Sequence, residues 1–216
     1  MAIKVKSYSE AELIKMFQLR RLAGNHAHPL MQELTDTSTI LNDGEQYIFD
    51  DISENLLTQI VGWNEEMLKM NLIAFVLRLG HLKETEQYKT YYESNLEDTV
   101  QGYFLKVRAY MMVASGILET PETPYFYFQE YKKLKDPKGD VAAQLLEAFL
   151  IAIEQNDNNN PMYGCTVSGK YWEFFVMQHQ VYCISETYDC TKKQDLMQII
   201  AILRKFKEIL DNRLLK

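Results

Sequence analysis

Cysteine is scarce in this chain of 216 residues, which contains only Cys165, Cys183 and Cys190. No two of them form a CxxC pair, and the odd number leaves one cysteine over in any disulfide scheme. Inside a cell such thiols normally stay reduced. We therefore expect three reduced cysteines with structural roles, and neither a disulfide framework nor a cysteine-based metal site.

Long apolar stretches are also lacking. The chain has no run of eighteen or more apolar residues, so the sequence predicts no membrane-spanning helix. The first stretch, MAIKVKSYSEAELIK, lacks the apolar core of a secretory signal. The sequence thus predicts a cytoplasmic protein that does not enter a membrane.

The chain has fewer basic residues than acidic ones. Lysine and arginine total 23 against 30 aspartates and glutamates, which gives a net charge of −7 and a pI near 5.2. This balance works against diffuse electrostatic binding to nucleic acid, although a local basic strip is compatible with it. The pair His26 and His28 lies in a polar stretch with no cysteine or third histidine nearby, so we interpret it as solvated.

The residues that are present suit a folded domain. Hydrophobic residues make up 47% of the chain and aromatic residues 12%, as in ordinary globular proteins. Residues 1–62 have mainly helical spacing of their apolar residues, and they are predicted to be a helical N-terminal extension packed on a core formed by residues 63–216. The two parts are expected to make one structural domain.

The core is expected to begin with a helix over residues 64–80. Asn64 is a suitable N-cap and Gly80 a suitable C-cap. Within this helix Glu66 shares a face with Met70, Ile73 and Leu77, whereas Glu65 lies beside Lys69. Two interpretations of Glu66 follow: a carboxylate aimed at a site in the core, or a first-turn acid favoured by the helix dipole.

The second half of the chain mixes strands and helices. Residues 99–116 alternate, with Leu105, Val107, Ala109, Met111 and Val113 on one predicted face. An aromatic strand over residues 125–132, a helix over 139–155, three short strands and a closing helix follow. This order predicts a mixed central sheet flanked by helices, which is an α/β (α+β) fold.

The stretch YFYFQEYKKLK, residues 125–135, carries the most suggestive pair of side chains. Glu130 and Lys132 are two residues apart on a strand, so they point to the same face. A carboxylate is a suitable ligand for Mg²⁺ or Mn²⁺, and an ammonium beside it can stabilise charge that develops on a phosphate. The pattern is weakly specific, because a lysine that reaches past an exposed glutamate at a strand end explains it equally well.

The following helix presents Gln144 on the side that is predicted to face the sheet, where an amide can orient a water molecule. With these elements the chain resembles the PD-(D/E)xK nuclease-like superfamily, and in particular small bacterial proteins of the type found in Bacteroides genomes. The stretches that carry the resemblance are WNEEMLKMNLIAFVLRLGHL, GYFLKVRAYMMVASG, PYFYFQEYKKLK, GDVAAQLLEAFLIA and MYGCTVSGKYWEFFVM.

The resemblance implies a restriction-endonuclease-like fold and Mg²⁺- or Mn²⁺-dependent hydrolysis of phosphodiesters. In that reading Glu66 and Glu130 hold the metal, Lys132 stabilises the phosphate and Gln144 positions water. One position departs from the pattern, since the aspartate of the superfamily's first strand falls at Tyr110. A phenol is neutral at pH 7 and a poor ligand for Mg²⁺, which predicts an impaired site.

Two hypotheses from different classes remain open. The first is an active or impaired metal-dependent nuclease. The second is a catalytically silent nuclease-like module that binds DNA, another nucleic acid or a protein partner, and a homodimer is compatible with either. Arg108, Lys133 and Lys135 are the expected nucleic-acid contacts, and their alternative is a solvated strand end.

Overall fold

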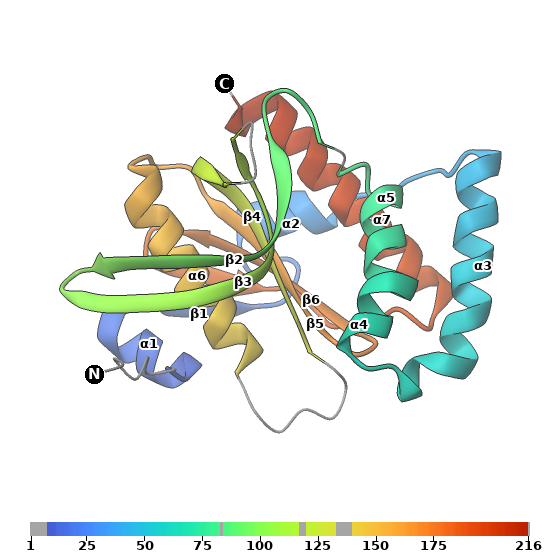
Figure 1. Ribbon diagram of the computed structural model, residues 1–216, viewed down its shortest axis with the longest axis horizontal. Coiled ribbons are helices and arrows are strands. Elements are labelled where there is room, and N and C mark those ends of the chain that lie inside the picture. Colours follow the sequence, from blue (N-terminus) through green and yellow to red (C-terminus); the bar gives the residue numbers. More distant parts are fainter. Residues whose placement is uncertain (1–7, 83, 117–119, 133–139, 216) are drawn as a thin grey trace.

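The computed structural model describes residues 8–82, 84–116, 120–132 and 140–215. In these residues an eight-stranded mixed sheet lies between two groups of helices (Figure 1). This arrangement confirms the α/β prediction at the level of fold class. No helix of the described residues combines the length and the hydropathy needed to cross a bilayer.

The sheet has the order β1-β7-β6-β5-β4-β3-β2, with β8 paired to β6. Strands β2, β3 and β4 form an antiparallel meander, whereas β4 and β5 are parallel. The strands are β1 (Arg20–Ala23), β2 (Lys89–Val100), β3 (Tyr103–Ser115), β4 (Glu122–Lys132), β5 (Met162–Ser168), β6 (Tyr171–Gln178), β7 (Val181–Ile184) and β8 (Tyr188–Asp189).

The helices cover both sides of the sheet. They are α1 (Glu10–Phe17), α2 (Pro29–Thr35), α3 (Asp43–Gln59), η1 (Ile60–Gly62), α4 (Glu65–Leu68), the π-helical η2 (Lys69–Ile73), α5 (Ala74–Leu79), α6 (Val141–Asn156), α7 (Lys193–Ile209) and the π-helical η3 (Leu210–Leu214). The predicted N-cap is confirmed, because the Asn64 side chain accepts a hydrogen bond from the Met67 amide at 2.9 Å.

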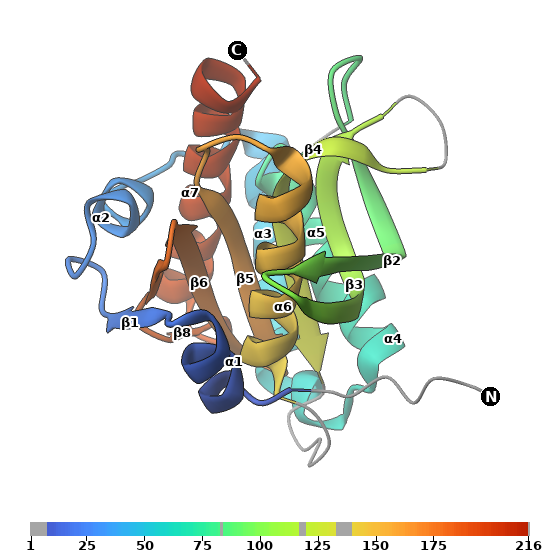
Figure 2. The same ribbon diagram turned by 90° about the vertical axis from the view of Figure 1, so that its left-hand side faces the viewer.

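Two hydrophobic cores result, one on each side of the sheet. Helices α1 and α6 pack on what we call the α6 face, and α2, α3, α4, α5 and α7 pack on the α7 face (Figure 2). Phe128 and Phe149 meet on the α6 face, and Tyr127 meets Phe206 on the α7 face. The three cysteines are buried and unpaired.

Strands β1 and β2 were not predicted, and β8 was not distinguished from the last of the three short strands. Strand β1 lies inside the segment that was expected to be mainly helical, and it joins the sheet by parallel pairing with β7. Its sequence, RRLA, is too short and polar to show an alternation; main-chain bonds such as Arg20 N–H to Gln180 O, at 2.7 Å, hold it. Strand β2 contains several acidic residues, and the alternation of its buried apolar residues shifts by one position part way along the strand.

This change of phase has a structural cause. The ladder between β2 and β3 is interrupted at Glu93 and Tyr110, and Glu93 has a positive φ of 52°. Residues 105, 107 and 109 therefore pack on the α6 face, whereas Met111 and Val113 pack on the α7 face. The prediction of one continuous apolar face from Leu105 to Val113 is wrong, because the strand turns over at this point.

Candidate functional site

Glu130 lies on β4 and is fully buried, with 0% of its surface exposed. It shares the α6 face with Phe128, two residues earlier on the same strand. Neither carboxyl oxygen has a hydrogen-bond partner among the described residues. Burial raises the pKa of Glu130 to about 8; the Tyr110 main chain and the Lys132 charge oppose this rise, and Glu147 adds to it.

Gln144 lies on the same side of the sheet, near the start of α6. Its Oε1 atom is buried and has no hydrogen-bond partner among the described residues. Position 144 precedes Ala148 and Ile151 by four and seven residues, and both pack in the α6-face core. The structure therefore places Glu130 and Gln144 on one face, as the sequence predicted, although no hydrogen bond joins them.

Glu147 belongs to this group and was not predicted. It is buried, and its Oε1 accepts a hydrogen bond from the Tyr8 amide at 3.2 Å. Burial raises the pKa of Glu147 to about 7, and the Tyr8 hydrogen bond opposes that rise. A signal was present in the sequence, since Glu147 is the one acid within the apolar run LLEAFLIA and follows Gln144 by three residues.

The Tyr110 ring lies on the opposite side. It packs with the α7-face core, and its ring centroid is 4.6 Å from that of Tyr131. Lys132 reaches this group from the end of β4: its Nζ donates to the Tyr110 hydroxyl at 3.0 Å and lies 3.9 Å from Glu65 Oε1. The ammonium of the Glu130–Lys132 pair thus bonds to a phenol hydroxyl, while the buried carboxyl still feels its charge.

Glu66 does not join Glu130. Its side chain is 74% exposed on α4 and pairs with Lys69 at 2.8 Å. Lys69 also pairs with Glu93 at 2.8 Å and lies over the Tyr131 ring, 5.4 Å from its centroid. Of the two interpretations of Glu66, the first-turn acid is confirmed and the carboxylate aimed at the core is wrong, because the denser apolar stripe of Leu68, Leu72 and Val76 takes the buried side of the helix.

The expected basic strip is largely neutralised where the structure describes it. Arg108 pairs with Glu93 at 2.5 Å, and the neighbouring Lys106 pairs with Glu97 at 2.5 Å. Both acids come from β2, the strand that was not predicted. Lys133 and Lys135 lie outside the described residues.

The side chains that were expected to hold Mg²⁺ or Mn²⁺ do not fit a divalent ion. In the described part of the chain, no group of three or more histidines, cysteines, aspartates or glutamates is placed to bind a metal. Glu66 is on the α7 face, and the phenol of Tyr110 bonds to Lys132. A raised pKa also leaves the Glu130 carboxyl largely protonated at pH 7, whereas Mg²⁺ prefers an ionised oxygen ligand.

The arrangement can therefore hold protons at two buried carboxyl groups more readily than it can hold a metal ion. Comparison with protein-family models and with curated proteins gave no match to this chain.

Proposed function

We propose that this protein is a catalytically silent nuclease-like module that acts by binding a protein partner. The observation that carries the proposal is the complete burial of Glu130, which keeps its carboxyl away from any bound phosphate. The carboxyl is enclosed under α6, and the ammonium bonds to the Tyr110 hydroxyl on the α7 face. Metal-assisted hydrolysis of a phosphodiester needs a carboxylate and a cation at the same phosphate.

The nuclease-like part of the proposal rests on the order of the elements. A helical segment (α4 to α5) precedes the antiparallel meander β2–β3–β4, and α6 then crosses to β5, which is parallel to β4. This is the order that the resemblance implies. The Glu130–Lys132 pair on β4 and Gln144 on α6, the next element, support this part of the proposal.

A protein partner is favoured over nucleic acid by the charges. The net charge is −7, and both Arg108 and Lys106 are paired with carboxylates of the same hairpin. A phosphate backbone would have to displace these acids before it could bind. The hairpin instead exposes aromatic rings at Tyr92 and Phe104, and aromatic residues are enriched at protein interfaces.

A cleavage assay tests the proposal. The wild-type chain is incubated with plasmid DNA, single-stranded DNA and RNA in Mg²⁺ or Mn²⁺, beside Glu130→Gln and the double variant Glu130→Gln/Lys132→Ala. We expect all three proteins to leave each substrate intact. Cleavage by the wild type that Glu130→Gln abolishes would overturn the silent assignment.

Fluorescence anisotropy with labelled DNA and RNA tests the choice of partner. We expect no binding above background at low salt. Binding that falls with rising salt and weakens in Arg108→Ala would favour a nucleic-acid module instead. Tyr92→Ala is the matched control, since it removes an exposed side chain of the same hairpin without removing a charge.

A further inference from the structure

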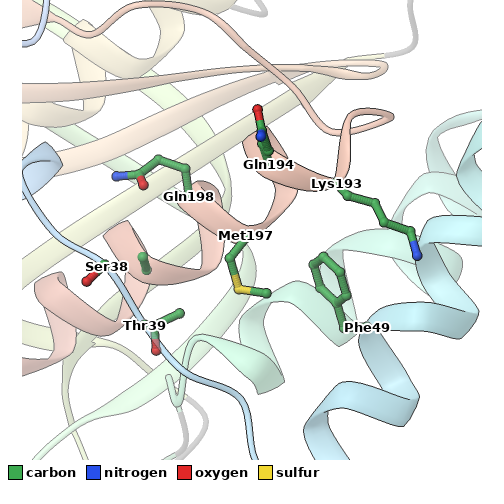
Figure 3. A pocket seen from close by; sticks show the side chains of 8 residues that line it. Ser38, Thr39, Phe49, Lys193, Gln194, Met197 and Gln198 are labelled. Carbon is green, nitrogen blue, oxygen red and sulfur yellow. The ribbon is translucent and has the colours of Figure 1, made fainter.

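A pocket of about 370 Å³ opens between α3 and α7 (Figure 3). Helix α3 lies at the opposite end of the molecule from the β2–β3 hairpin (Figure 1). Phe49 of α3 and Met197 of α7 project into it from opposite walls (Figure 3). Ser38 and Thr39, from the connector between α2 and α3, close a third side. The pocket is thus apolar at its base and polar at its rim.

The connector is held firmly beside this pocket. Gln198 Nε2 donates to the carbonyl oxygens of Thr35 and Thr37, at 2.8 and 3.2 Å. Arg204 Nη1 donates to Thr39 Oγ1 at 2.8 Å and to the Ile40 carbonyl at 3.1 Å. These bonds fix the main chain beside Ile40, whose side chain is 90% exposed.

The walls of the pocket carry opposite charges. On α3, Asp43, Tyr47, Asp50 and Glu54 follow one another at intervals of four, three and four residues, so they form one stripe. Tyr47 is 78% exposed within it. At the start of α7, Lys192 and Lys193 are exposed. Lys193 Nζ bonds to Asp50 at 3.1 Å within the same chain, so Lys192 and the other acids of the stripe are the charges that a partner can meet.

We propose that this surface binds a second copy of the same chain as a two-fold symmetric dimer, in which Ile40 of each copy enters the pocket of the other. A two-fold contact uses the same patch on both copies, so the patch must carry both the projecting group and the cavity that receives it. Here both lie within one connector and its two neighbouring helices. The acidic α3 stripe of one copy then faces Lys192 of the other. The dimer is independent of the proposed partner binding, which uses the opposite end of the molecule.

Sedimentation velocity of the full chain over a dilution series tests the dimer. We expect a species with the mass of two chains that dissociates on dilution, and at least a tenfold weaker association in Ile40→Asp, which corresponds to about 1.4 kcal/mol. Phe104→Asp is the control, because it adds the same charge at an exposed apolar position on the distant hairpin. We expect it to associate like the wild type.

Exchanging the charges of Glu54 and Lys192 provides a second test of the dimer. Glu54→Lys and Lys192→Glu should each weaken the dimer, and the double variant should recover association, because the reversed charges again face each other across the two-fold axis. Circular dichroism confirms that each variant is folded. A single-chain mass at every concentration would overturn the proposal, and so would a dimer that Ile40→Asp leaves unchanged. A monomer whose pocket takes up an apolar fluorescent dye, with uptake lost in Met197→Asp, would likewise overturn it and assign the pocket to a small apolar ligand.

Discussion

At Glu130 the chain buries a carboxyl group whose interaction with the Tyr110 main chain does not offset its removal from water, and the buried carboxyl of Glu147 lies on the same face. Removal from water disfavours the ionised form, and the second acid adds to that effect, so the pKa of Glu130 is about 8 and that of Glu147 about 7. An unpaired buried carboxylate would be costly. The folded chain therefore retains protons that the unfolded chain releases.

This difference predicts how stability depends on pH. Because the folded pKa of Glu130 lies above its usual value of 4.5, the folded state binds more protons between those two values, and its stability falls as pH rises from about 4.5 to about 8. Glu130→Gln removes the titration, so its melting temperature should vary less with pH and exceed that of the wild type most near pH 8, by the equivalent of a few kcal/mol.

Melting temperatures of both proteins at a series of pH values between 5 and 8 check this expectation. Glu66→Gln is the control for the loss of a carboxyl group from the surface, because that side chain is 74% exposed. If the melting temperatures of the wild type and Glu130→Gln changed equally with pH, Glu130 would ionise freely in the folded protein and the prediction would be wrong.

At the scale of elements, the close packing of α6 on the sheet determines what surrounds Glu130. Gly164 on β5 lies beneath α6 and pairs with Phe128 of β4. A Cβ atom added at Gly164 would lie 2.5 Å from the Phe128 carbonyl oxygen and 2.9 Å from the Phe149 ring. Only glycine at this position allows α6 to pack so closely on β5. This close packing also encloses the space around Glu130.

Gly164→Ala should therefore destabilise the protein by about 1–3 kcal/mol, the usual cost of overpacking a core. Gly62→Ala is a matched control, since nothing lies within 4 Å of the Cβ position there. Urea denaturation of the two variants and the wild type measures the difference. Equal free energies of unfolding for both variants would mean that α6 can move away from the sheet at little cost.

At the scale of the whole molecule, the sheet separates the residues that a metal site would need. Glu130, Gln144 and Glu147 lie on the α6 face, whereas Glu66 and the Tyr110 ring lie on the α7 face. The separation follows from the fold as a whole, because α4 and α6 cover opposite sides of β4. No single substitution at position 110 restores a carboxylate beside Glu130.

Divalent ions should then leave the stability of the protein unchanged. A ligand that binds only the folded state raises its melting temperature, and it does so more at higher concentration. We expect millimolar Mg²⁺ or Mn²⁺ at pH 7 to produce no rise in the wild type, with the same result for Glu130→Gln. A rise that occurs in the wild type and is absent from Glu130→Gln would contradict this picture and locate an ion at Glu130.

The sequence by itself determined the pattern of most elements. Alternation predicted β3 and β4, helical spacing predicted α6 and α7, and Asn64 was identified as an N-cap, because these signals are local and involve residues a few positions apart. Their order was enough to predict a mixed sheet between helices. Strands β1 and β2 were not predicted. Strand β1 is held by main-chain bonds to β7, and in β2 the alternation of buried residues shifts at Glu93.

Only the tertiary structure decided which side chains share a face. The reversal at Glu93 and Tyr110 sends the Tyr110 ring to the α7 face, and the stripe of Leu68, Leu72 and Val76 turns Glu66 to solvent. Both outcomes depend on how strands twist and how helices compete for burial against distant neighbours. Glu130 and Gln144 lie on the same side of the sheet because β4 and α6 are consecutive elements and their apolar faces must meet.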